Sequence, residues 1–564
     1  MPSGTNRICL ALFTLVTAAG NGCNGAGAIV NDARVDAPDA ALGDVPHASD
    51  EGRDETDSRD TQGLPDAGDG DASACPEGQV RCDGDWTALC RDGTPVRVAD
   101  CAGDGWTCRA GRCVSTGAET PTEAAWRARL DDLRTANASD PLAIDDRGGW
   151  TGAPESLGTP EATGFFRVEK LGDTWWFVTP EGRPFLSKGV TDVNFLGPNL
   201  AMDDLQAALA AKYGSEAAWA DAAEDRLDDW GFNTVGPWSG ASIAARRPSA
   251  EDILDIVWRV RPKGHPIGDF LRPDYPDIVR QVAAERCAPR RDDPSFLGYF
   301  LDNELVWENS WQTKKPLLRL YWEFPADQPG RAAAAAFLRG KAGDSLATFN
   351  AAWGTALGSW DDLAGLPADA LEPETTEARA WSEAFTLHVF ERYASEAVQA
   401  IREADPNHLV LGCRFSTWHS DALIAAAARH FDVVSLAYYA EVPPVAQLDR
   451  FAPALDRPFL IEEWSFKAED SGLMNVLFYA PVVPTQKDRG LEYDAYVEAL
   501  VRRPWVVAYH WYKWFDNPPR EDNLLAGDNF GLIDKDDVPY APFVRMVREV
   551  NRRAERWHAE GIGP

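Results

Sequence analysis

The sequence predicts an α/β fold organised as a (β/α)8 barrel, because eight short apolar, β-rich segments alternate with helical ones. The apolar segments are continuous runs, which is typical of parallel strands buried on both faces. They comprise residues 184–195, 232–236, 253–260, 297–304, 409–415, 433–439, 459–466 and 506–512. A doubly wound open sheet is the alternative, but no glycine-rich phosphate loop follows the first strand.

Helical patterns fill the intervals between these strands. Residues 217–230 and 491–502 suit helices, and one long helix is predicted between the fourth and fifth strands. Its apolar stripe repeats every four residues: Trp381, Phe385, Val389, Tyr393, Ala397 and Ile401. Short alternating strands with turns at 172–173 and 180–182 precede the barrel, so the barrel domain is predicted over 161–560 with a short β-rich segment in front.

The N-terminus has the pattern of an export signal. Arg7 precedes an apolar core at residues 8–19, and Cys23 follows small residues as in bacterial lipoproteins. Residues 1–22 are therefore predicted to be a signal peptide of lipoprotein type, with ordinary cleavage near residues 18–22 as the alternative. The expected location is outside the cytoplasm: the cell surface or outer membrane as a lipoprotein, otherwise secreted or periplasmic. A lipid on Cys23 would be the one link to a membrane.

Three further segments are predicted before the barrel. Residues 23–74 form a disordered acidic linker, since positions 24–74 hold 13 acidic side chains against three arginines. Residues 75–114 form a small disulfide-rich module, because six cysteines in an exported chain suit three disulfides better than zinc, whose paired C-x2-C spacing is missing. Residues 115–160 are a connector. Cys287 and Cys413 are expected to be buried thiols.

Two barrel strands end on carboxylates. Glu304 closes the fourth segment, LGYFLDNE, and Glu463 lies late in the seventh, FLIEEWSF. Active sites of such barrels gather at the C-terminal ends of the strands, where the two acids could converge. Paired carboxylates are the groups that hydrolyse glycosidic bonds. The alternative is that each acid caps a helix or pairs with an arginine.

The motifs around these acids resemble those of retaining glycoside hydrolases with (β/α)8 barrels, and most closely β-agarases and related β-galactosidases. The matching segments are GYFLDNEL (298–305), RPFLIEEW (457–464), YHWYKWFDNP (509–518) and FLRGKAGDSLATFNAAWGT (337–355). The resemblance implies that Glu304 is the acid/base, Glu463 the nucleophile, and Asn303 a ligand of the sugar 2-hydroxyl. Glu462 is the rival nucleophile, and since neighbouring strand residues face opposite ways, only one is expected to point inward.

Other polar and aromatic residues at strand ends are predicted to bind the sugar. This group comprises Asn194, Trp238, Arg414, Tyr439, His510, Trp511 and Asp516. Tyr439 is expected to hydrogen-bond the nucleophile, whereas Asp302 and Glu308 are expected to be structural. No cofactor or metal is predicted, because the eight histidines lack H-E-x-x-H spacing.

The expected function is an exported glycoside hydrolase that cleaves β-linked sugars, including agarose or other β-galactans, by a retaining mechanism. The formal net charge of −34 argues against nucleic acid and anionic membrane surfaces as partners. The expected partner is a poly- or oligosaccharide substrate. A non-catalytic carbohydrate-binding protein on the same barrel, or a transglycosylase, are the alternatives.

Overall fold

The computed structural model describes residues 121–562, apart from 198–202, 249–251, 309, 311, 478 and 518–526. Upstream it describes only the course of five strands: β1 (Val80–Asp83), β2 (Trp86–Arg91), β3 (Thr94–Asp100), β4 (Trp106–Arg109) and β5 (Arg112–Ser115). The export signal, the acidic linker and the cysteine side chains of the 75–114 module lie outside the described residues.

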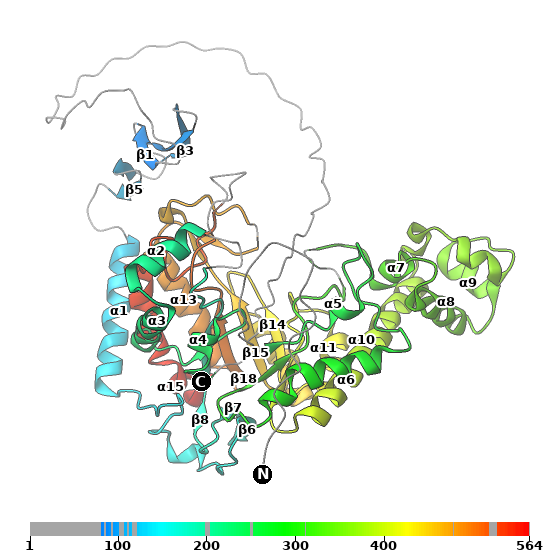
Figure 1. Ribbon diagram of the computed structural model, residues 1–564, viewed down its shortest axis with the longest axis horizontal. Coiled ribbons are helices and arrows are strands. Elements are labelled where there is room, and N and C mark those ends of the chain that lie inside the picture. Colours follow the sequence, from blue (N-terminus) through cyan, green and yellow to red (C-terminus); the bar gives the residue numbers. More distant parts are fainter. Residues whose placement is uncertain are drawn as a thin grey trace, which may run out of the picture. The chain divides into compact units, whose positions relative to one another are not determined.

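Eight parallel strands form the barrel, and seven of them lie wholly within predicted segments. They are β9 (Ser187–Val190), β10 (Thr234–Val235), β11 (Asp252–Ile253), β12 (Gly298–Phe300), β13 (Leu409–Gly412), β14 (Val434–Ala437), β15 (Phe459–Trp464) and β18 (Val506–Trp511). Figure 1 shows several of these strands at the centre of the domain, among them β14, β15 and β18. Pairing joins β10, β9, β18, β15 and β14 in one sheet and β11, β12 and β13 in another, and a bridge from Phe415 to Leu436 links the end of β13 to β14. Among the described residues no strand pairing joins β10 to β11. The α/β barrel is therefore confirmed.

The third predicted strand is wrong in its second half. The segment 253–260 contains only the end of β11, after which Asp255 adopts a left-handed φ of 53° and the chain turns into the short helix α5 (Val257–Val260). An apolar run cannot distinguish a strand from a buried helical turn, because both place large aliphatic groups in the core.

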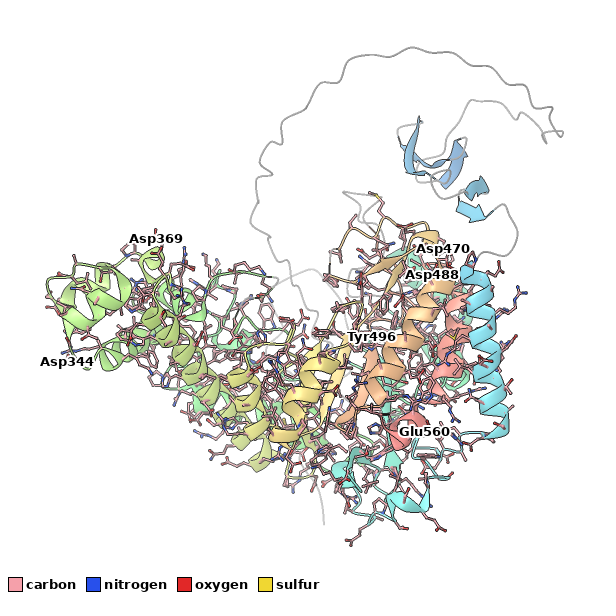
Figure 2. All side chains as sticks on the ribbon, turned by 180° about the vertical axis from the view of Figure 1, so that it is seen from behind. Asp344, Asp369, Asp470, Asp488, Tyr496 and Glu560 are labelled. Carbon is pink, nitrogen blue, oxygen red and sulfur yellow. The ribbon has the colours of Figure 1, made fainter. Side chains whose placement is uncertain are left out.

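The helices cover the outer faces of the strands. The long predicted helix is α10 (Thr376–Ala404), and all six residues of its stripe are buried. The predicted helices at 217–230 and 491–502 are α3 (Glu216–Asp229) and α13 (Gln486–Val501). A helical insertion after β12 contains α7 (Leu317–Trp322), α8 (Pro329–Lys341) and α9 (Leu346–Trp353) and extends to one side of the barrel, where Figure 2 labels Asp344 and Asp369. Cys287 and Cys413 are buried, as predicted.

The short β-rich segment closes one end of the barrel. Strands β6 (Arg167–Leu171), β7 (Thr174–Val178) and β8 (Pro184–Phe185) form an antiparallel sheet, as the alternating pattern predicted. Phe166, Phe177 and Phe185 pack in one cluster with residues of the barrel strands, including Leu297, Leu409 and Val507. This apolar plug lies at the N-terminal ends of the strands, so the opposite end is left for a site.

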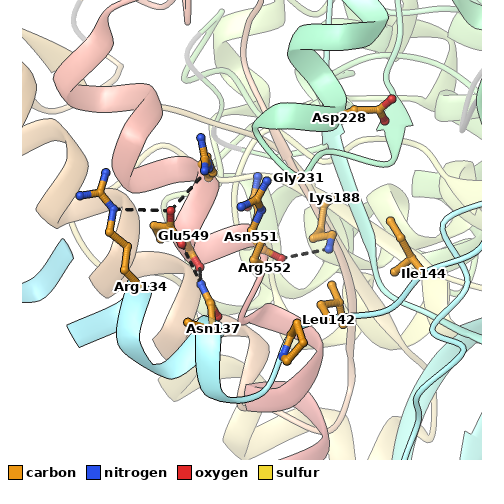
Figure 3. Close-up of a pocket in the computed structure, with 13 residues that line it drawn as sticks. Arg134, Asn137, Leu142, Ile144, Lys188, Asp228, Gly231, Glu549, Asn551 and Arg552 are labelled. Atoms are coloured by element: carbon orange, nitrogen blue, oxygen red, sulfur yellow. Dashed lines mark hydrogen bonds and ion pairs between the residues drawn. The ribbon is translucent and has the colours of Figure 1, made fainter. Parts of the chain in front are cut away.

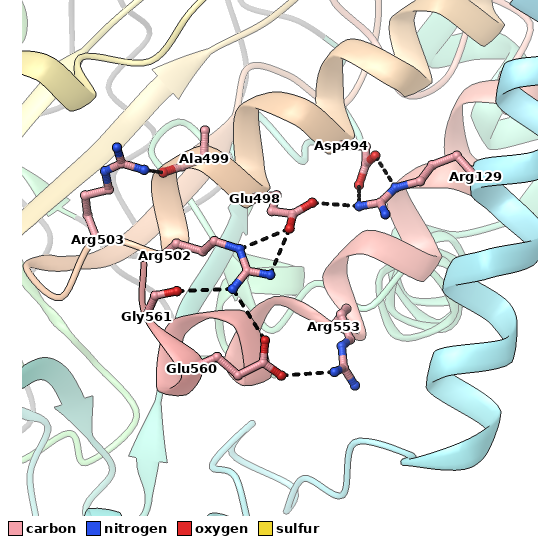
Figure 4. A network of polar contacts seen from close by, with 9 residues as sticks. All are labelled: Arg129, Asp494, Glu498, Ala499, Arg502, Arg503, Arg553, Glu560 and Gly561. Carbon is pink, nitrogen blue, oxygen red and sulfur yellow. Dashed lines mark hydrogen bonds and ion pairs between the residues drawn. The ribbon is translucent and has the colours of Figure 1, made fainter. Parts of the chain in front are cut away.

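The helix α1 (Pro121–Ser139), within the predicted connector, packs on the barrel helices. Trp126, Leu130 and Leu133 are buried in the main core. Arg129 donates to Asp494 (2.6 Å) and Glu498 (2.7 Å) of α13, and this network continues to the C-terminal helix α15 (Ala554–Glu560) through Arg502 and Glu560 (Figure 4). No helix in the described part of the chain is both long and apolar enough to cross a membrane.

A buried ion pair ties the first barrel strand to the last helix. Lys188 on β9 contacts Glu555 on α15, and each side chain is 1% exposed. We expect Glu555→Gln to lower the free energy of unfolding by about 3–5 kcal/mol, because the buried ammonium would lose its counter-charge. Urea denaturation followed by tryptophan fluorescence would measure this. The matched control is Asp536→Asn, which breaks the exposed Lys535–Asp536 pair and should cost at most about 1 kcal/mol; equal losses would contradict the prediction.

Candidate active site

Left-handed residues follow five consecutive barrel strands at their C-terminal ends. Asp192, Trp238, Asp255, Glu304 and Arg414 have φ angles of 56°, 62°, 53°, 47° and 52°, and each comes two to four residues after β9, β10, β11, β12 or β13 ends. Non-glycine residues seldom adopt this conformation, and where they do they cluster at functional sites. Three of the five are predicted site residues.

Arg414 is the centre of the polar contacts at this end of the barrel. Its guanidinium is fully buried, donates from Nε to Oδ1 of Asn303 (2.6 Å), and donates from Nη2 to Oε1 of Glu463. Its backbone N–H donates to the hydroxyl of Ser435 (3.0 Å). The end of β13 is thereby joined to the ends of β12 and β15 and to Ser435 within β14.

Glu463 receives hydrogen bonds at both carboxylate oxygens. Arg414 occupies Oε1, and the hydroxyl of Tyr439 donates to Oε2 over 2.7 Å. The structure thus shows the predicted bond between Tyr439 and Glu463. Donors at both oxygens fix the orientation of this carboxylate.

Glu304 lies in the same electrostatic neighbourhood. Its backbone N–H donates to the carbonyl of Arg414 (3.0 Å), and its side chain is partly exposed. Glu304 and Glu463 both raise the pKa of Tyr439 and of Tyr512 by repelling the phenolate, in addition to the larger effect of burial. The two predicted carboxylates therefore act on the same pair of tyrosines at this end of the barrel.

Glu462 also faces Arg414, which corrects the expectation that only one of the two adjacent glutamates points inward. Strand β15 has one extra residue relative to each of its neighbours. Against β14, Leu436 pairs with Ile461 but the next residue, Ala437, pairs with Glu463. Against β18, Tyr509 pairs with Ile461 and Trp511 pairs with Trp464. This β-bulge at Glu462 breaks the alternation of side chains. Glu462 Oε2 lies 3.5 Å from Nη1 of Arg414.

The two glutamates differ in their hydrogen bonding. Neither carboxylate oxygen of the fully buried Glu462 accepts a hydrogen bond from the described residues. Burial raises the pKa of Glu462 well above its usual value, and the charges of Glu463 and Glu304 raise it further, while Arg414 lowers it. Glu462 is therefore suited to the protonated state.

Aromatic rings surround the carboxylates. The ring of Trp238 lies 5.0 Å from the Arg414 guanidinium carbon and 6.5 Å from the ring of Tyr512, which lies 6.2 Å from that of Tyr439. Tyr479 packs edge-on against Tyr439 at 5.0 Å. Tyr512 and Tyr479 were not predicted. Tyr512 ends the eighth apolar segment and could have been proposed from that position, whereas Tyr479 comes from a loop whose course the sequence does not reveal.

The structure places two predicted sugar ligands away from these acids. Trp511 is fully buried against Tyr493 of α13 and Phe543 of α14 (Ala541–Asn551), so its ring faces the helices and not the barrel mouth. Asp516 accepts hydrogen bonds from Tyr540 (2.5 Å) and from the N–H of Gly531 (2.8 Å), which fixes the C-terminal segment instead. A residue's place near a strand end does not determine which way its side chain points.

Asn194, Asp302 and Glu308 stabilise the loops around the site. Asn194 donates to the carbonyl of Trp238 (3.4 Å) and accepts from the N–H of Leu196 (3.0 Å). Asp302 is buried and accepts from the N–H of Val257 and the hydroxyl of Tyr393, while Glu308 accepts from Ser420. The structural roles expected for Asp302 and Glu308 are confirmed.

The 13 residues drawn in Figure 3 line a cavity of about 530 Å³ that lies elsewhere. It is formed by α1, the 141–144 segment and α14, and includes Gly231 just before β10, so it adjoins the N-terminal end of that strand. Catalytic sites of (β/α)8 barrels lie at the other end. Within the described ranges no group of three or more His, Cys, Asp or Glu residues is arranged to hold a metal ion.

His510 lies inside the barrel on β18. Its Nε2 contacts the hydroxyl of Ser187 at 2.9 Å, and a Cβ on Gly189 would come within 2.4 Å of its ring, so only glycine fits beside it. Burial, and secondarily the positive charge of Arg414, lower the pKa of His510 from 6.5 to about 3. The folded protein therefore holds this imidazole neutral.

This depressed pKa predicts acid sensitivity. The unfolded chain binds a proton on His510 below pH 6.5, whereas the folded protein does so only near pH 3. The contribution of the neutral imidazole to the free energy of unfolding is therefore complete above pH 6.5 and decreases as the pH falls below that value. At pH 5 the loss should be about 2 kcal/mol. We expect His510→Gln to reduce the difference between the urea midpoints at pH 7 and pH 5. A variant with the wild-type difference would contradict this.

Comparison with known proteins supports the resemblance. The chain is 25% identical over 482 residues to β-agarase B and 28% identical over 380 residues to β-agarase A, both of Vibrio sp. (strain JT0107). These alignments cover 72% and 61% of this chain but only 49% and 36% of the relatives, so it spans half of their length or less. No protein-family model matches the chain.

Solved structures show the same fold. An exo-β-agarase superposes with a TM-score of 0.63 at 23% identity, covering 80% of this chain and 72% of the other. A second agarase gives a TM-score of 0.62 at 24% identity, covering 80% and 73%. The predicted resemblance is confirmed: the chain is a distant homologue of the β-agarases and has the fold of their solved structures.

Proposed function

We propose that this protein is a glycoside hydrolase that cleaves β-linked galactans, with agarose as the first candidate. The observation that carries the proposal is the arrangement around Glu463, whose carboxylate is held by Arg414 and Tyr439 in the same neighbourhood as Glu304. The similarity to β-agarases supports the choice of substrate. A protein that only binds sugar would not need two converging acids.

The proposed reaction retains the anomeric configuration. Glu304 donates a proton to the leaving oxygen while Glu463 attacks the anomeric carbon, which gives a glycosyl ester. Glu304 then removes a proton from water, which hydrolyses the ester and restores both acids. Arg414 and Tyr439 hold Glu463 in position for attack.

Asn303 is suited to bind a sugar hydroxyl. Its Oδ1 is occupied by Nε of Arg414, and Nδ2 has no partner among the described residues. This hydrogen bond fixes which end of the amide faces outward, so that the N–H groups are available as donors. We propose that they bind the 2-hydroxyl of the sugar attached to Glu463.

The site is expected to act outside the cytoplasm. We propose export by the N-terminal signal, with Cys23 as the point of lipid attachment. Radiolabelled palmitate in cells producing the full chain, with Cys23→Ala as the control, would test the attachment.

Three glutamine variants test the assignment of the acids. We expect Glu463→Gln to abolish release of reducing sugar from agarose, and Glu304→Gln to lower kcat by about 10²–10⁴-fold, because the nucleophile and the proton donor would be lost. Glu462→Gln is the matched control, since a neutral amide resembles the protonated acid that its burial favours, and it should keep most of the activity.

The outcome also separates the alternatives. Loss of activity in Glu462→Gln but not in Glu463→Gln would move the nucleophile to Glu462. NMR of the first-formed product should show the anomeric configuration of the substrate, whereas inversion would overturn the retaining mechanism. Wild-type protein that binds agarose without cleaving it would favour the carbohydrate-binding alternative, and elongated products would favour a transglycosylase.

A further inference from the structure

Trp258 is an unusual side chain for its position. Nine large apolar side chains in the described part of the chain are exposed, and Trp258, at 48% exposure, is the only aromatic one. It lies on α5, directly after barrel strand β11, whereas its neighbours Val257 and Val260 are buried. A single exposed apolar side chain is common on protein surfaces, so Trp258 points to a ligand only together with the groups beside it.

The guanidinium of Arg261 completes this surface. Its carbon lies 3.8 Å from the centre of the Trp258 ring, so it covers one face of the indole. Arg261 makes no hydrogen bond or ion pair with any described residue. Burial lowers the pKa of its guanidinium, but an arginine remains charged at neutral pH. Its N–H donors are therefore available to hydroxyl groups beside the exposed indole.

Asp302 fixes this surface next to the acid/base side of the site. It accepts the N–H of Val257 (2.8 Å), the residue before Trp258, and lies two residues before Glu304. The N–H of Leu254 donates to the carbonyl of Phe300 (2.9 Å), so the segments that lead to Trp258 and Glu304 run side by side. The segment that carries Trp258 is thus the direct neighbour of the segment that carries Glu304, the proposed proton donor to the leaving group.

We propose that Trp258 and Arg261 form an outlying saccharide-binding site for the leaving-group side of a neutral galactan chain. The apolar face of a pyranose would stack on the indole, and its hydroxyls would accept from Arg261. The net charge of −34 disfavours polyanionic polymers at long range, which is why the expected chain is uncharged. This inference rests on the proposed function and adds that the substrate extends beyond the sugars at the two acids.

The test compares long and short substrates. For wild type and Trp258→Ala, kcat/KM is measured on the shortest cleaved agarose oligosaccharide and on agarose itself. The ratio of kcat/KM on agarose to kcat/KM on the short oligosaccharide should fall about tenfold in Trp258→Ala, because one stacking contact is lost. In Trp258→Phe, which keeps an aromatic ring, we expect this ratio to be largely restored. Ile144→Ala is the matched control, because Ile144 is also 48% exposed but lines the cavity near the N-terminal end of the barrel.

Binding gives a readout that does not depend on turnover. In a native gel that contains dissolved agarose, wild type should be retarded relative to a gel without it, and Trp258→Ala should be retarded less. An unchanged ratio, or an equal fall on long and short substrates, would overturn the proposal while leaving the proposed function intact. Wild type without activity but with retardation that depends on Trp258 would refute only the proposed function, and wild type with neither would refute both.

Discussion

The active-site end of the barrel depends on one buried cation. The Arg414 guanidinium is inaccessible to water, and a buried charge is tolerated only where charged or hydrogen-bonding partners replace its hydration. Asn303 and Glu463 provide those partners from the ends of β12 and β15. Loss of the guanidinium would leave the carboxylates of Glu462 and Glu463, which both contact it, without a positive charge beside them. The charge balance of the site and the contacts between the ends of β12, β13 and β15 therefore depend on the same side chain.

The left-handed residues explain how the chain brings these groups inward. A strand that continued straight would carry its next side chains past the barrel rim. A left-handed residue turns the chain at that point, and in Glu304 and Arg414 the turning residue is itself one of the polar groups of the site. Such conformations cost about 1–3 kcal/mol each, and the buried hydrogen bonds between strand ends offset that cost.

Much of the barrel could be predicted because its signals are local. Seven of the eight apolar segments contain a whole strand and the third contains the end of β11, while the stripe of α10 indicates a helix through its repeat alone. The direction of individual side chains was harder to predict from the sequence, because it depends on packing between segments that are distant in the chain. Trp511 and Asp516 face core partners at 493, 531, 540 and 543, which no local pattern associates with them. The bulge in β15 could not be predicted either, because it arises from the pairing of this strand with β14 and β18.

The bulge changes how the adjacent glutamates should be distinguished. In an unbroken strand, direction alone would assign one of them to the site, but here both approach the same guanidinium. What separates them is hydrogen bonding: Glu463 has a donor at each oxygen, and Glu462 has none among the described residues. One arginine cannot neutralise three ionised carboxylates, so the acid without donors is the one that favours its proton. A neutral Glu462 leaves the charge of Arg414 to Glu463, and this asymmetry makes Glu463 the better candidate for the nucleophile.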